Sequence, residues 1–133
     1  VKRDETWCTP LPHKTVATRA GLGWIGKSCL LVTQAYGSAV RLSALLTDAP
    51  LPPDSPVDES RCRACTVCVT HCPAQALTGV LWQVGVPREA LFHREVCKKT
   101  QIQRMKQATG IEDDLCGLCF AVCPYTQRYL KAP

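Results

Sequence analysis

The feature that most constrains this chain is a run of four closely spaced cysteines that ends at a proline. The run is Cys62-x2-Cys65-x2-Cys68-x3-Cys72-Pro73. This spacing is typical of loops that hold [4Fe–4S] clusters. Three thiolates set three residues apart on a winding loop can cover three corners of one cubane, and the fourth cysteine then reaches a second cluster. The run therefore favours two inorganic clusters over one.

A partial repeat of this run lies near the end of the chain, as Cys116-x2-Cys119-x3-Cys123-Pro124. When the two Cys-Pro ends are aligned, the missing first cysteine falls on Asp113, whose carboxylate is a poor ligand for soft iron–sulfur chemistry. The runs thus supply four and three thiolates, whereas two cubanes need eight. Cys97, isolated at the start of a predicted helix, is the natural eighth ligand.

The crossed ligation of two-cluster ferredoxins turns these eight thiols into a specific prediction. The first cluster is predicted to be held by Cys62, Cys65, Cys68 and Cys123. The second cluster is predicted to be held by Cys72, Cys97, Cys116 and Cys119. Cys8 and Cys29 are left over. Cys29 stands in an apolar segment and is predicted to be a small buried hydrophobic side chain, and an unreactive thiol is also the simpler interpretation of Cys8.

Two other uses of the cysteines fit the spacing less well. Zinc sites prefer two C-x2-C pairs set well apart, unlike a tight triple followed by Cys-Pro. Disulfides need an oxidising compartment, and the polar start of the chain has no apolar region typical of a signal peptide. No stretch of 18 apolar residues is present, so a membrane span is not expected. We therefore predict a cytoplasmic iron–sulfur protein.

The formal net charge is +5, from 16 basic and 11 acidic residues. A basic chain can indicate nucleic-acid binding. Eight cluster thiolates would however remove eight charges, and two cubane cores of about +2 each would return about four, leaving roughly +1. The densest basic group consists of Lys98, Lys99, Arg104 and Lys106. We interpret it as a solvated helix face, and binding of a nucleic acid such as tRNA is the weaker hypothesis.

The pattern of apolar and turn residues predicts an α+β chain, with a small α/β remnant before a bicluster ferredoxin-like module. Residues 1–48 are predicted to form the partial α/β segment, 49–61 a connector and 62–133 the double [4Fe–4S] domain. In the first segment we expect a helix over 13–20 that ends at Gly21, a buried strand over 28–33, and another apolar element over 39–46. A turn over 36–38 separates these last two.

The connector contains four prolines in the eight residues 49–56, which excludes a helix interior or a central strand. Beyond it we expect strand-like pieces over 77–86 and a helix start with Pro87 at its first position. The longest helix is predicted over 95–109, where Gly110 stops it, and a last helical piece follows Pro124.

A glycine-rich segment, Gly21-Leu-Gly-Trp-Ile-Gly26-Lys27-Ser28, fits both the P-loop and the dinucleotide-binding patterns. Both patterns require a strand directly before the glycines and a helix directly after them. Here the expected order is reversed, with a helix before and a strand after. We therefore interpret the segment as a tight connection with Trp24 and Ile25 packed inward.

Several of these motifs together resemble epoxyqueuosine reductases. The resemblance rests on Pro12 to Lys27, Tyr36-Gly-Ser38, Leu46-Thr-Asp48, Leu51-Pro-Pro-Asp54 and both cysteine runs. That family is related in architecture to reductive dehalogenases and joins a cobalamin-binding domain to a bicluster ferredoxin module. The resemblance implies the same split of the eight ligands, and it implies that residues 1–48 are cobalamin-domain-like. It also implies a corrinoid-facing loop made by Gly21, Gly23, Gly26, Lys27 and Ser28.

The predicted function is electron transfer through two [4Fe–4S] clusters. The alternative is the electron-delivering part of a cobalamin-dependent reductase, with a redox partner protein or an upstream catalytic domain as its partner. If the chain belongs to an enzyme, that enzyme is an oxidoreductase whose catalytic domain lies largely elsewhere, and we expect a short relative or a fragment.

Alignment on Pro10 and Gly21 places Trp7 where the resembled family has its aspartate proton donor.

Overall fold

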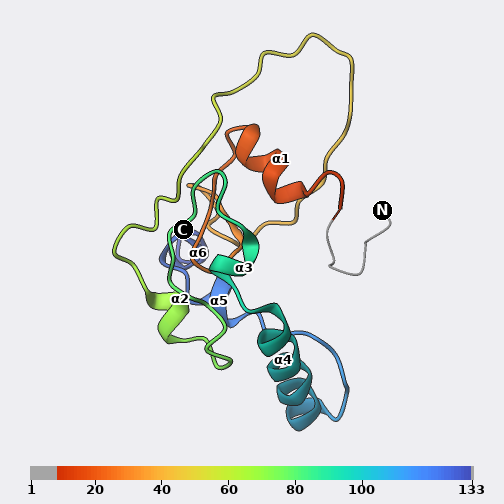
Figure 1. Ribbon diagram of the computed structural model, residues 1–133, viewed down its shortest axis with the longest axis vertical. Coiled ribbons are helices and arrows are strands. Elements are labelled where there is room, and N and C mark those ends of the chain that lie inside the picture. The colour runs from red at the N-terminus through yellow and green to blue at the C-terminus, as the bar shows by residue number, and fades with distance from the viewer. Residues whose placement is uncertain (1–8, 133) are drawn as a thin grey trace.

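The structure is a computed structural model that describes residues 9–132, and Figure 1 shows little regular structure for a chain of this length. The elements in chain order are α1 (His13–Arg19), β1 (Trp24–Ile25), β2 (Leu31–Val32), α2 (Val67–Thr70), α3 (Arg88–Leu91), α4 (Arg94–Thr109), α5 (Leu118–Ala121) and α6 (Pro124–Leu130). Mixed helix and strand content was predicted, and this coarse class is confirmed. Within the described residues, no helix is long and apolar enough to cross a membrane.

The N-terminal part is built from α1 and a two-stranded antiparallel sheet. The helix stops as predicted, with Ala20 as its C-cap and Gly21 in the left-handed region at φ +71°. In the sheet, Trp24 pairs with Val32 and Ile25 with Leu31. The order is therefore α1, then β1 inside the glycine-rich segment, then β2. A helix precedes the glycines and a strand follows them, which confirms the predicted difference from a nucleotide-binding loop. The inward packing of Trp24 and Ile25 is confirmed too, since both are buried.

Two elements predicted for the N-terminal part differ from the structure. The strand expected over 28–33 shrinks to Leu31–Val32, because Cys29 has a φ of +58° and cannot continue an extended strand. The apolar element expected over 39–46 has neither helix nor strand. Val40 and Leu42 pack against the hydrophobic core, but Leu45 and Leu46 are 90% and 84% exposed. No strand of the described chain pairs with this segment, so it has no ladder to join.

The proline-rich connector lacks regular structure, as its composition predicts. It lies in the long yellow arc of Figure 1. Its far end returns to α1, where the Val57 amide donates to the Thr18 carbonyl at 2.9 Å. Arg19 and Asp58 also form an exposed ion pair of 2.9 Å. The end of the connector is therefore fixed on the N-terminal part just before the cysteine run begins.

In the cysteine-rich part, the helices follow their predicted signals more closely than the strands do. The strand-like pieces expected over 77–86 are only isolated bridges, Leu77 to Phe92 and Gln83 to Glu59. Pro87 is the N-cap of α3 rather than its first residue. The long helix α4 ends at Gly110, whose φ is +77°, and α6 begins with Pro124 in its first turn, so both predictions are confirmed.

The C-terminal helix α6 is held against the N-terminal part by three close contacts. The Trp24 and Tyr125 rings meet edge to face at 5.0 Å, and the Tyr36 and Tyr129 rings do so at 5.2 Å. The Ser38 amide donates to the Thr126 hydroxyl at 2.9 Å, and Thr126 is fully buried. Since Cys123 is the N-cap of α6, these contacts also set the position of the last cysteine.

Candidate metal centres

The first group of cysteines surrounds a cavity between the glycine-rich connection and α6. The sulfur-bearing residues of this cavity are Cys62, Cys65, Cys68, Cys119 and Cys123. A tight turn brings the first two together, with the Cys65 amide donating to the Cys62 carbonyl at 2.9 Å. Cys68 follows on α2, and Cys123 arrives from the far end of the chain at the start of α6. The structure thus brings together the four residues predicted for the first cluster.

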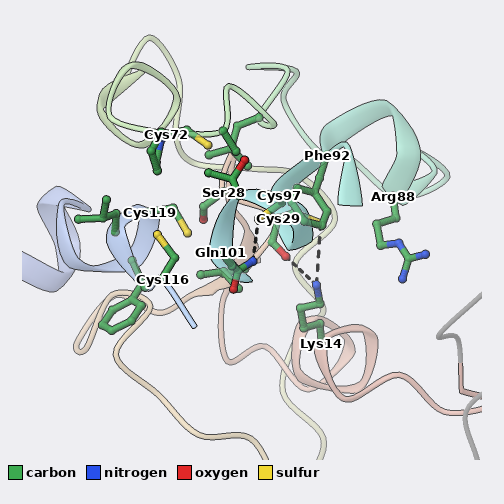
Figure 2. A pocket seen from close by; sticks show the side chains of 18 residues that line it. Lys14, Ser28, Cys29, Cys72, Arg88, Phe92, Cys97, Gln101, Cys116 and Cys119 are labelled. Carbon is green, nitrogen blue, oxygen red and sulfur yellow. Dashed lines mark hydrogen bonds between the residues drawn. The ribbon is translucent and has the colours of Figure 1, made fainter. Parts of the chain in front are cut away.

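The second group lies around a neighbouring cavity, shown in Figure 2. Its cysteines are Cys29, Cys72, Cys97, Cys116 and Cys119. Cys97 comes from the first turn of α4, and the last two come from the start of α5 and the residues before it. The four residues predicted for the second cluster are therefore also brought together, and Cys29 is added to them. The ligand assignment itself stays a prediction.

The thiols within each group influence one another electrostatically. Burial, followed by the charges of the nearby thiolates of the first group and of Cys119, raises the pKa of Cys68 to about 11. Burial also raises the pKa of Cys119 to about 11, with contributions from Cys97, Cys116 and Cys72. Such thiols deprotonate readily only when cations offset their charge, which iron would do.

Cys97 has a stronger link to the second group than Cys29 has. Among the charges that raise the pKa of Cys119, that of Cys97 is the largest, whereas Cys29 contributes to none of the resolved shifts. The pKa of Cys97 is itself raised by burial, while a hydrogen bond from Gln101 opposes the rise. Cys97 is therefore linked electrostatically to Cys72, Cys116 and Cys119, the other three residues predicted for the second cluster.

Hydrogen bonds reach sulfurs of the second group, including those of Cys97 and Cys72. The Gln101 side-chain amide donates to the Cys97 sulfur at 2.9 Å, one of the dashed lines in Figure 2. The Ala76 backbone amide donates to the Cys72 sulfur at 3.4 Å. Hydrogen bonds of this kind stabilise the more negative, reduced state of a cluster and so raise its potential. Sequence analysis missed Gln101, although its place one helical turn after Cys97 is a usable signal.

The donor set fits iron–sulfur clusters. Each cavity collects soft thiolates from separate loops, and thiolates are the ligands that such clusters take. In residues 9–132, no three or more His, Cys, Asp or Glu side chains are placed to hold a single metal ion. The sulfurs instead surround a space, as ligands at the corners of a cubane would.

Cys29 is buried at 6% exposure, as predicted, but its surroundings are not purely apolar. The Lys14 ammonium donates to the Cys29 carbonyl at 2.6 Å and lies 3.9 Å from its sulfur. Lys14 thereby lines the second cavity, a role that no sequence signal indicated. The predictions for Cys8 and Trp7 lie outside the described residues.

The end of the glycine-rich segment, Gly26 to Ser28, lies against the cysteines of the first cavity. A β-carbon on Gly23 would overlap the Val32 carbonyl, and one on Gly26 would lie 3.5 Å from the Cys62 sulfur. Lys27 and Ser28 line the first cavity. Gly23, Gly26, Lys27 and Ser28 are all buried, and only Gly21 is partly exposed. The corrinoid-facing role of these five residues stays a prediction, and a corrin ring there would find little accessible surface.

Residues 61–126 match the family described as "4Fe-4S double cluster binding domain". The cysteine-rich part belongs to this family. The match therefore begins one residue before the first predicted ligand and ends three residues after the last. Iron–sulfur chemistry, predicted from the cysteine spacing, is confirmed for this part of the chain.

Most of the chain is similar to epoxyqueuosine reductases, as its motifs predict. It is 34% identical to that of Bacillus anthracis over 116 residues, which is 86% of this chain and 29% of the relative. It is 44% identical to that of Vibrio cholerae over 119 residues, covering 89% and 31%. The chain thus spans about a third of the length of these relatives.

Solved structures show the same relation. A selenomethionine-labelled epoxyqueuosine reductase matches with a TM-score of 0.65 at 28% identity, over 90% of this chain and 31% of that one. An epoxyqueuosine reductase with an epoxyqueuosine-modified tRNA-Tyr stem loop matches with a TM-score of 0.63 at 30% identity, over the same shares. The double-cluster domain and the segment before it therefore occur together, in this order, in larger reductases.

Proposed function

We propose that the chain holds two [4Fe–4S] clusters and passes single electrons through them. The observation that carries this proposal is that Cys119 lines both cavities, so the two sites share a wall. Electron tunnelling falls steeply with distance, and two clusters in adjoining cavities would exchange electrons rapidly. The first cluster is assigned Cys62, Cys65, Cys68 and Cys123. The second is assigned Cys72, Cys97, Cys116 and Cys119.

A repeated local structure supports a ferredoxin-like module. In each run a four-residue helix, α2 or α5, is followed within two residues by a Cys-Pro pair. The two helices contact each other. This pairing would place Cys68 beside Cys123 and Cys119 beside Cys72, as crossed ligation requires.

A reductive titration tests the proposed function. The anaerobically reconstituted chain should take up two electrons, one per cluster, from a strong one-electron reductant. The measurement is bleaching of the visible sulfur-to-iron absorption together with the growth of electron paramagnetic resonance (EPR) signals. Cys29→Ser is the matched control, because it removes a cavity-lining thiol outside the ligand set and should still take up two electrons. An uptake of one electron by the unaltered chain would contradict the proposal.

A second candidate function is electron delivery inside a cobalamin-dependent reductase of the epoxyqueuosine reductase type. The coverage of about a third of such reductases favours it. Its partner would then be a catalytic domain, while a carrier would meet a separate redox protein. A cobalamin-domain coding sequence directly upstream would favour delivery within one enzyme. Binding of a tRNA stem loop at modest salt would be expected only of the enzyme.

A further inference from the structure

Lys27 is a lysine in an unusual place. Its residue is only 6% exposed, and an ammonium group is costly to bury without a negative partner. Its side chain donates to the Arg63 backbone carbonyl at 2.9 Å. No ion pair joins Lys27 to a carboxylate among the described residues. A carbonyl dipole offsets only part of the charge, so a further negative group is needed.

The surroundings of Lys27 indicate which group that is. Lys27 lines the same cavity as Cys62, Cys65, Cys68 and Cys123. Arg63 lies inside the ligand loop between Cys62 and Cys65, and its φ of +48° is uncommon for a residue with a side chain. The hydrogen bond from Lys27 therefore holds this loop in a strained conformation at the edge of the cavity. Both its charge and its position therefore indicate that the negative group beside Lys27 is the occupant of the first cluster site.

We propose that Lys27 is the buried counter-charge of the first cluster and that it stabilises the reduced state. The inference rests on the proposed function. Four thiolates and a core of about +2 give a net charge of about −2, and uptake of one electron makes it about −3. A fixed positive charge in a desolvated site favours the more negative state. Lys27 thus raises the reduction potential of the first cluster and positions the Cys62–Cys65 loop.

The chain offers a matched control in Lys14. It carries the same charge at the second cavity, where it contacts Cys29, and it is only half-buried. Lys27→Gln and Lys14→Gln remove one identical charge each, from different cavities. Lys27→Arg keeps the charge and the ability to donate to the Arg63 carbonyl.

The experiment measures the midpoint potential of each cluster by EPR-monitored redox titration of the full reconstituted chain. The signal of the first cluster is assigned with the Cys97→Ser variant, which is expected to retain only that cluster. Lys27→Gln should lower the potential of the first cluster more than that of the second. Lys14→Gln should do the reverse, and Lys27→Arg should keep the first potential near that of the unaltered chain.

An unchanged first-cluster potential in Lys27→Gln would overturn the proposal. If Lys27→Gln fails to hold the first cluster, the Lys27→Arg variant shows whether the site needs the positive charge or the shape of the lysine side chain. A retained cluster in the arginine variant supports a need for charge, and equal loss in both variants overturns the proposal in favour of side-chain shape. Failure of the proposed function itself would appear separately, as a single cluster in the unaltered chain.

Discussion

In the Cys97→Ser variant, we expect the reconstituted chain to hold about half the iron of the unaltered protein, or about four atoms per chain. The physical reason is that, in the proposed assignment, Cys97 supplies the fourth thiolate beside Cys72, Cys116 and Cys119, while the first group has four thiolates without it. A serine hydroxyl is a harder and far less acidic ligand than a thiol. The second cluster should therefore be lost or severely altered, and the EPR signal of the first should persist.

The Cys29→Ser variant distinguishes Cys97 from Cys29 as the eighth ligand. Both cysteines line the second cavity, and both lie outside the two cysteine runs. If Cys97→Ser keeps both cubanes unaltered while Cys29→Ser loses one, the eighth ligand is Cys29. If Cys97→Ser loses one cluster and Cys29→Ser keeps full iron content, the assignment of Cys97 stands.

The second large effect is expected at Gly37, which lies far in sequence from Cys123 and helix α6. Its φ is +58°, and a β-carbon there would lie 2.5 Å from the Thr126 hydroxyl oxygen, with the Thr126 amide closer still. Alanine would add a left-handed backbone cost of about 1–2 kcal/mol and an overpacking cost of about 1–3 kcal/mol. We expect Gly37→Ala to lower the free energy of unfolding by about 3 kcal/mol in anaerobic urea titration, and to lower occupancy of the first cluster because α6 carries Cys123.

Gly110→Ala is the control for backbone strain. Gly110 also has a positive φ, +77°, but nothing lies within 4 Å of the position its β-carbon would take. Its replacement should cost about 1 kcal/mol, from backbone conformation alone. Equal losses in the two alanine variants would mean that the contact between Gly37 and α6 contributes nothing to stability.

The parts of the fold that could be predicted from the sequence are those set by residues close together in the chain. The cysteine spacing identified the iron–sulfur part, and Gly110 and Pro124 marked the ends of their helices, because these features act through neighbouring residues. The strand predicted over 28–33 is shorter in the structure because Cys29 has a left-handed backbone conformation. In that conformation the Cys29 carbonyl accepts a hydrogen bond from Lys14, which lies 15 residues earlier in the chain. No pattern of neighbours encodes such a contact.

The candidate sites show the same division. The grouping of cysteines could be predicted, since the spacing within each run is local and the crossed ligation of two-cluster ferredoxins relates one run to the other. The burial of Lys27 could not, because its partner Arg63 lies 36 residues away in sequence. The glycines before Lys27 resemble a phosphate-binding loop, yet the structure uses them for close approach to Val32 and Cys62. A motif alone therefore did not identify what the loop faces.

The central claim is that one chain holds two cubane clusters, and the most direct test is to count their atoms. After anaerobic reconstitution, iron and acid-labile sulfide should each reach about eight per chain, determined against protein concentration from amino-acid analysis. A reproducible value of about four iron and four sulfide would contradict the claim.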